Sequence, residues 1–206
     1  MRLEGELRID VDPPRAATVL CHPHPRAGGS KDHPILWALR NELAGARGFA
    51  ALLFNFRGVM GSEGTHGGGH AEVKDARAAL TFVTQRAPDV AVLLGGWSFG
   101  ASVALRESLD DHRVGALALI GIPLVPRDLD LPALPDPAEI LAAGRPTIFA
   151  AGEHDVYCPP DALRAYGKAS GAKTLIVENT DHFFWRREHE LAAAIADWAE
   201  QALDLG

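Results

Sequence analysis

Six short apolar segments recur along the chain, and amphipathic stretches of helical period separate most of them. The apolar segments are nearly continuous rather than alternating, which is typical of strands buried on both faces of a parallel sheet. We therefore predict an α/β fold, with a mostly parallel sheet covered by helices on both faces. The expected strands are 17–22, 50–56, 90–96, 115–122, 146–152 and 173–179, and the expected helices are 33–48, 69–87, 98–109, 160–169 and 186–203.

Two segments fall outside this alternation. Residues 3–10 (LEGELRID) predict an additional edge strand, which we expect to be antiparallel. Residues 123–145 are rich in proline and predict an irregular insertion that is too short to be a domain of its own. We therefore expect a single domain over residues 1–206, in which any lid over a site is small.

Charge and cysteine usage narrow the possible partners and the cellular compartment. The net charge of −7 argues against nucleic acid or an anionic membrane as the main partner, because both require a basic face. Two cysteines without a CxxC motif form no disulfide framework, which favours a reducing compartment. The N-terminus lacks an apolar signal core, and no apolar run approaches the ~18 residues of a membrane span. We expect a cytoplasmic protein that acts on a small molecule, with homo-oligomerisation left open.

The stretch 96–100 (GWSFG) lies where a predicted strand ends and a predicted helix begins. It matches the G-x-S-x-G nucleophile elbow, whose turn is too tight for side chains at the two glycine positions. The turn strains the serine and projects its hydroxyl, and the partial positive charge of the helix N-terminus faces the site. The alternative is that Ser98 only caps the helix. The strand before it and the helix after it favour a nucleophile.

A serine nucleophile needs a general base, and the base needs an orienting acid. These groups are expected beyond the carboxyl ends of the strands, in the chain order Ser, Asp or Glu, His. Asp155 follows strand 146–152 and His182 follows strand 173–179, so we predict them as acid and base. Four rivals are less well placed, because they adjoin this pair in sequence or follow an earlier strand: His154, Asp181, Asp128 and Asp130.

An oxyanion hole requires two backbone N–H donors. Phe99, the residue after the serine, is expected to supply one of them. The loop HPHP (22–25) is expected to supply the other, and its two prolines have no N–H. His24 is therefore the predicted second donor, with Arg26 as the second choice.

Two histidine motifs suggest other roles. His22 and His24 form an H-x-H pattern that also occurs in metal sites. The intervening proline and the lack of a third ligand nearby in sequence argue against a metal, so we expect no metal or cofactor and assign His22 to loop hydrogen bonds. The stretch HGGG (66–69) is similar to the oxyanion motif of lipases, but it follows the second central strand rather than the first, and we interpret it as a flexible loop.

Taken together, these motifs resemble the alpha/beta hydrolase superfamily, and within it a group of small bacterial serine hydrolases marked by HPHP and NFRG. The resemblance implies the alpha/beta hydrolase fold with a minimal cap or none. It also implies a Ser98, Asp155 and His182 triad that works through an acyl-enzyme, without a cofactor. The matching segments run in order over most of the chain: HPHP (22–25), NFRGV (55–59), GWSFGA (96–101), GEHD (152–155) and DHFF (181–184).

The resemblance favours hydrolysis of esters or related acyl compounds, as in carboxylesterases. Amidases, peptidases, thioesterases and acyltransferases use the same triad, and a non-catalytic binding member of the fold is a further alternative. Dienelactone hydrolases share the compact outline but have cysteine where this chain has Ser98. Aromatic residues near the motifs favour short or aromatic acyl groups over long chains. The candidate pocket residues are Arg26, Trp97, Tyr157, Cys158 and Phe183.

Three charged residues near the NFRG motif need separate interpretation. Arg57 could bind a substrate carboxylate, but we favour a role in which it ties loops together through backbone carbonyls. Glu72 and Asp75 lie on the helix 69–87 and are expected to partner nearby N–H or arginine groups rather than to act as catalytic acids.

Overall fold

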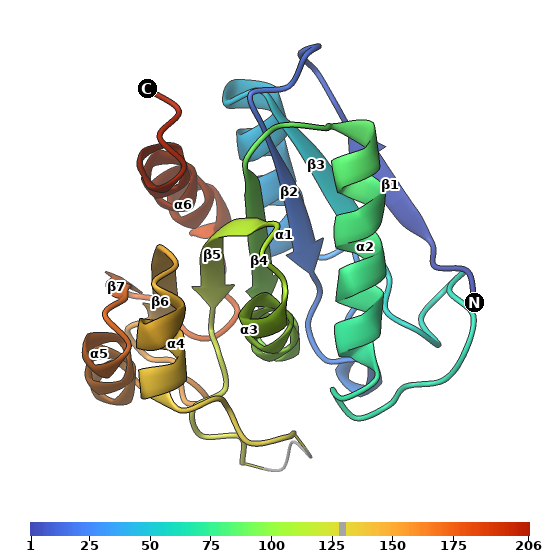
Figure 1. Ribbon diagram of the computed structural model, residues 1–206. Coiled ribbons are helices and arrows are strands. Elements are labelled where there is room, and N and C mark those ends of the chain that lie inside the picture. The colour runs from blue at the N-terminus through green and yellow to red at the C-terminus, as the bar shows by residue number, and fades with distance from the viewer. Residues whose placement is uncertain (128–130) are drawn as a thin grey trace.

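The computed structural model describes residues 1–127 and 131–206, and a seven-stranded sheet forms its centre (Figure 1). The strand order is β1-β3-β2-β4-β5-β6-β7. β1 pairs antiparallel with β3 at one edge, and the other neighbours are parallel. The strands are β1 (Gly5–Arg8), β2 (Ala16–Cys21), β3 (Phe49–Phe54), β4 (Val92–Trp97), β5 (Val114–Ile120), β6 (Thr147–Gly152) and β7 (Lys173–Val177).

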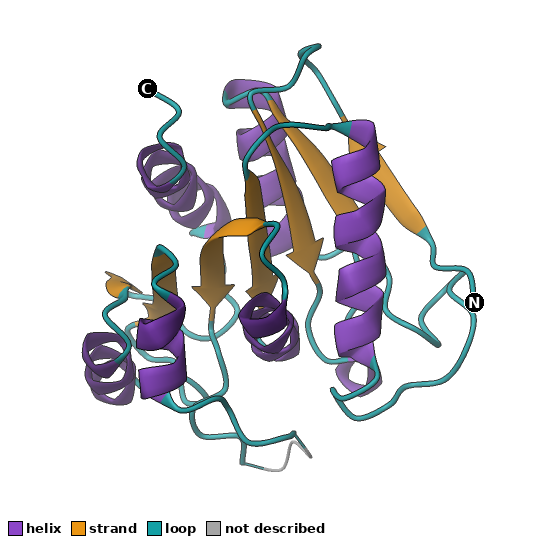
Figure 2. Ribbon diagram, in the orientation of Figure 1, coloured by secondary structure: helices purple, strands orange, loops and turns teal. Residues whose placement is uncertain are grey.

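Helices cover both faces of this sheet (Figure 2). One core lies between the sheet and α2, α3, α4 and α5, and the other lies between the sheet and α1 and α6. Within the described residues, no helix combines the length and apolar character needed to cross a membrane. The helices are α1 (Pro34–Arg40), α2 (Glu72–Arg86), α3 (Phe99–Asp110), α4 (Pro137–Ala143), α5 (Pro160–Ala169) and α6 (Glu188–Ala202), and a π-helical segment (Asn41–Ala46) continues α1.

The central strands are buried on both faces, as their continuous apolar sequences predict. Every residue of β2, β3 and β4 is buried. Successive side chains of a strand point to opposite faces, so Val19 lies in the core beside α2 while Leu20 lies in the core beside α1. The predicted alternation of parallel strands and helices, including the antiparallel edge strand, is confirmed.

The stretch 123–145 is more regular than the sequence interpretation allowed. It contains the helix α4, so the prediction of a wholly irregular insertion is wrong. The helix begins with a capping box in which the Asp136 side chain accepts the N–H of Ala138 at 2.8 Å and Glu139 accepts the N–H of Asp136 at 2.8 Å. This arrangement satisfies N–H groups that a short helix would otherwise leave open. The rival acids Asp128 and Asp130 lie outside the described residues.

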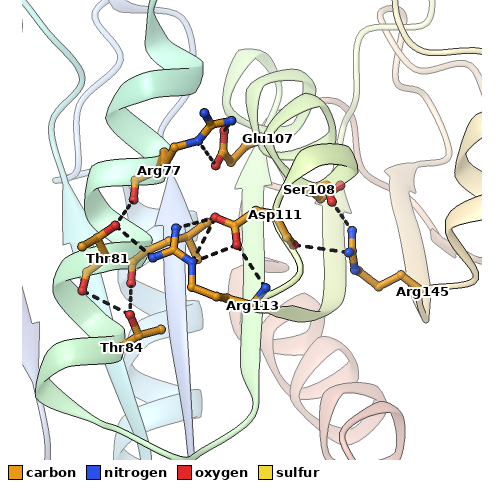
Figure 3. Close-up of polar contacts among 9 residues, drawn as sticks. Arg77, Thr81, Thr84, Glu107, Ser108, Asp111, Arg113 and Arg145 are labelled. Carbon is orange, nitrogen blue, oxygen red and sulfur yellow. Dashed lines mark hydrogen bonds and ion pairs between the residues drawn. The ribbon is translucent and has the colours of Figure 1, made fainter.

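Buried polar contacts fasten the end of α3 that lies away from Ser98 (Figure 3). The Glu107 carboxylate is fully buried and accepts two hydrogen bonds from Arg77 of α2, at 2.8 and 3.0 Å. Asp111 pairs with Arg113 just before β5, and this guanidinium lowers the pKa of Asp111 to about 2. The Arg77–Glu107 pair therefore joins α2 to α3 at the end of α3 that is farthest from Ser98.

Candidate active site

Ser98 occupies the turn between β4 and α3, with backbone angles φ 56° and ψ −119°. This conformation is costly for a residue with a Cβ and is typical of strained functional turns. The turn also requires its glycines, because a Cβ on Gly96 would lie 2.4 Å from Gly100 C and one on Gly100 would lie 2.2 Å from Cys21 O. Within the described residues, Ser98 makes no side-chain capping bond to α3, so helix capping does not explain this serine.

The loops after β6 and β7 bring two partners to this hydroxyl. His182 Nε2 lies 3.0 Å from Ser98 Oγ, and His182 Nδ1 lies 2.8 Å from Asp155 Oδ2. Since the carboxylate fixes the Nδ1–H tautomer, Nε2 is free to accept the serine proton. All three residues are buried. The structure therefore brings together the three residues that the sequence singled out as nucleophile, base and acid.

Main-chain contacts hold the acid and the base in place. Asp155 Oδ1 accepts the N–H groups of Tyr157 at 2.9 Å and Cys158 at 2.8 Å, which leaves Oδ2 for the imidazole. The indole N–H of Trp97 donates to the carbonyl of His182 at 3.1 Å. The rivals lie apart from this arrangement, since the His154 side chain is exposed and Asp181 accepts the N–H of Phe183 on the surface.

Gly121, which follows β5, supports the imidazole from behind. Its φ is +54°, and a Cβ at this position would lie 3.0 Å from His182 Cε1 and 3.1 Å from Nδ1. The imidazole therefore packs directly against the backbone of residue 121, where only glycine leaves room for the ring.

Replacing Gly121 with alanine is expected to lower kcat strongly, because the new methyl group displaces His182 from Ser98. The left-handed backbone also costs roughly 1 kcal/mol of folding stability for a residue with a Cβ. Gly144→Ala is the matched control, since φ is +61° there and no atom lies within 4 Å of the added Cβ. Ester turnover and thermal unfolding of both variants check this; similar losses of kcat in the two would contradict it.

The two residues predicted to supply the oxyanion donors lie side by side, with their ring centroids 5.0 Å apart. Phe99 is the first residue of α3, and His24 precedes a short 3-10 turn at Pro25–Ala27. Among the described residues, neither backbone N–H has a hydrogen-bond acceptor. The second-choice donor is already used, because the N–H of Arg26 donates to His24 Nδ1 at 3.1 Å.

A cavity of about 140 Å³ opens onto Ser98 and His182. The predicted residues Trp97, Tyr157 and Phe183 line it, whereas Arg26 and Cys158 do not. Arg26 is exposed to solvent, and Cys158 is fully buried in the core, with its N–H donating to Asp155. A larger groove of about 550 Å³ lies between β1 and α2, away from these residues.

Sequence reasoning missed His33 as a wall of this cavity. Its ring packs against Trp97 at a centroid distance of 4.1 Å, and its Nδ1 accepts the N–H of Ile35 at 3.3 Å as the N-cap of α1. The signal was the dipeptide His33-Pro34 at the start of a predicted helix, where proline favours the first helical position. Burial lowers the pKa of His33 to about 4 and also lowers the pKa of His24, so both rings are neutral at neutral pH.

The charged residues of the neighbouring loops have structural partners. Arg57 donates to the buried Asp75 carboxylate at 2.9 and 2.6 Å, so its partner is an acid and not the backbone carbonyls that we expected. Glu72 accepts backbone N–H groups of the glycine-rich loop, as predicted. His22 also behaves as predicted, since Nε2 accepts the N–H of Phe56 at 3.0 Å and Nδ1 lies 2.7 Å from Pro23 O.

The chain is similar to known proteins over nearly its whole length. An uncharacterized protein of Rickettsia prowazekii, RP471, is 29% identical over 202 residues, which are 96% of this chain and 84% of that one. The solved structure of an alpha-beta serine hydrolase homologue from Coxiella burnetii is 25% identical, with a TM-score of 0.82 and coverage of 95% and 90%. XC6422 of Xanthomonas campestris, described as a serine hydrolase without lid, is 25% identical, with a TM-score of 0.81 and coverage of 98% and 89%.

Residues 14–204 match the family model of the alpha/beta hydrolase domain. The sheet order, the strand-turn-helix at Ser98 and the lack of a cap among the described residues agree with that fold. The family and the serine hydrolase structures support a hydrolase. The chain therefore belongs to the alpha/beta hydrolase family.

Proposed function

We propose that the protein is a serine hydrolase that cleaves esters of short or aromatic uncharged acyl groups through an acyl-enzyme on Ser98. One observation carries this proposal. Ser98 lies in a strained turn, its side chain makes no capping bond to α3 within the described part of the chain, and its hydroxyl ends a hydrogen-bonded chain that runs through His182 to Asp155. This is the geometry in which a weak hydroxyl nucleophile gains a general base and the base gains an orienting acid.

In the proposed mechanism, His182 Nε2 takes the proton of Ser98 Oγ as the oxygen attacks the acyl carbonyl. Asp155 stabilises the imidazolium that forms. The backbone N–H groups of His24 and Phe99 hold the oxyanion of the tetrahedral intermediate. His182 then gives its proton to the leaving alcohol. Water, activated by the same imidazole, attacks the acyl-enzyme and releases the acid.

The cavity supports the preference for small neutral acyl groups. Its volume of about 140 Å³ is close to the ~150 Å³ of an apolar cavity that holds benzene. The walls are mainly aromatic, with the rings of His33, Trp97, Tyr157 and Phe183 around the serine. Among the described residues, no lysine or arginine lines it, so a carboxylate on the acyl group would lose its hydration without gaining a partner.

A series of nitrophenyl esters tests this proposal. We expect kcat/KM to be highest for acetate, butyrate and benzoate and to fall steeply for decanoate, because the longer chain exceeds the cavity. A series in which the fastest turnover occurs at ten or more carbons would overturn the substrate assignment. Matched amides and thioesters, and added alcohols as competing acceptors, separate an esterase from an amidase, a thioesterase and an acyltransferase, which use the same triad.

A further inference from the structure

His66 contacts both residues that supply the proposed oxyanion donors. It lies in the loop between β3 and α2, outside the cavity. Its ring centroid is 5.1 Å from that of His24 and 5.5 Å from that of Phe99, and these two rings are 5.0 Å from each other. Rings from the loop after β2, the loop after β3 and the first residue of α3 therefore form one cluster, which we call the ring cluster.

A buried carboxylate lies against His66 and orders the loop that follows it. Glu72, the first residue of α2, is fully buried and accepts the N–H of Gly67 at 2.7 Å and that of Gly69 at 2.8 Å. Its Oε1 also lies 2.9 Å from His66 Nδ1, a close contact that is not aligned as a hydrogen bond. The helix N-terminus and the two N–H donors stabilise the negative charge there. Glu72 thus orders the glycine-rich loop that follows His66 and also contacts the His66 imidazole directly.

We propose that His66 and Glu72 are positioning residues for the oxyanion hole. The inference rests on the proposed function, because it concerns the N–H groups of His24 and Phe99. These donors lie in the segments that follow two different strands, β2 and β4, and they stabilise an oxyanion only when both converge on one point. Contacts of this kind must hold a site within ~0.5 Å of its productive geometry. The ring cluster connects the segment of His24 to the segment of Phe99, and Glu72 contacts its third ring, His66.

A purely structural role for Glu72 makes a different prediction. A carboxylate that only orders the glycine-rich loop would affect folding stability without changing the rate per active site. A positioning role acts on the transition state, since the oxyanion forms only there. The split between kcat and KM, measured per folded active site, therefore distinguishes the two roles.

Glu107→Gln provides the matched control for Glu72→Gln. Both carboxylates are fully buried and both accept two N–H donors, from Arg77 in the case of Glu107. Glu107 lies on the far part of α3, roughly 12 Å along the helix from Phe99 at 1.5 Å per residue (Figure 3). Both substitutions keep the size of the side chain and remove the charge.

The test measures His66→Ala, Glu72→Gln and Glu107→Gln with a short nitrophenyl ester, after titrating active sites with a fluorophosphonate. We expect kcat per labelled site to fall ~10-fold or more in the first two, since loss of a whole oxyanion donor costs about 10²–10³-fold. KM should change little, and affinity for a boronic acid that forms a tetrahedral serine adduct should fall in parallel with kcat. Glu107→Gln should keep the wild-type kcat.

The positioning role would be overturned if Glu72→Gln had the same kcat per labelled site, and the same affinity for the boronic acid, as Glu107→Gln. If His66→Ala does not fold, the isosteric Glu72→Gln decides the question. A wild-type protein that neither labels nor turns over esters would instead refute the proposed function itself, so the two failures are distinguishable.

Discussion

Replacing Ser98 with alanine is expected to abolish ester turnover, with a loss in kcat on the order of 10⁶, because removing a nucleophile disables the whole triad. The fold should be unaffected. Ser98 Oγ is not a helix cap, and alanine meets the same strained backbone as serine. Steady-state hydrolysis of a short nitrophenyl ester, with thermal unfolding measured alongside, checks both expectations.

Ser108→Ala is the matched control for this substitution. Ser108 is a fully buried serine within α3, and its hydroxyl donates to Leu105 O at 2.6 Å near the far end of the helix. It should keep wild-type turnover. Residual hydrolysis in Ser98→Ala at more than a small fraction of the wild-type rate would mean that another group performs the attack.

Replacing Asp155 with asparagine is expected to lower kcat by ~10⁴, as loss of the orienting acid does in a Ser-His-Asp triad. The structure gives a specific reason. The N–H groups of Tyr157 and Cys158 both donate to Oδ1, so an asparagine places its carbonyl oxygen there and turns its NH₂ toward His182 Nδ1. That amide donates, which forces the proton of His182 onto Nε2 and leaves no acceptor for Ser98.

Asp181→Asn is the control for the acid, because Asp181 adjoins His182 in sequence and lies on the surface. It should turn over esters at close to the wild-type rate. Measured kcat values for the two variants decide between the acids: a strong loss in Asp181→Asn with a mild one in Asp155→Asn would reverse the assignment.

The central sheet and the triad geometry could be predicted because their signals are local. A buried parallel strand is a continuous apolar run, and the turn at Ser98 needs glycines at fixed offsets, since Gly96 and Gly100 touch neighbouring backbone. The acid and base then follow from chain order, because the carboxyl ends of parallel strands meet at one edge. Asp155 and His182 needed no knowledge of distant contacts.

The pocket and the support of the oxyanion loops depend on contacts between distant segments. Cys158 is close to Asp155 in sequence, yet the turn that satisfies the carboxylate also places this cysteine in the core. The HGGG motif predicts only a flexible loop, because the packing of His66 against His24 joins two different strand-to-helix connections. The cap of α4 at Asp136, by contrast, has a local sequence signal, the Asp-Pro-x-Glu pattern of residues 136–139.

The central claim is that Ser98 is the nucleophile, and covalent labelling tests it most directly. The folded wild-type protein and Ser98→Ala are treated with a fluorophosphonate probe, and the modified peptide is mapped by mass spectrometry. We expect one adduct, on Ser98, in the wild type and none in the variant. An unlabelled wild type, or equal labelling of both proteins, would contradict the claim.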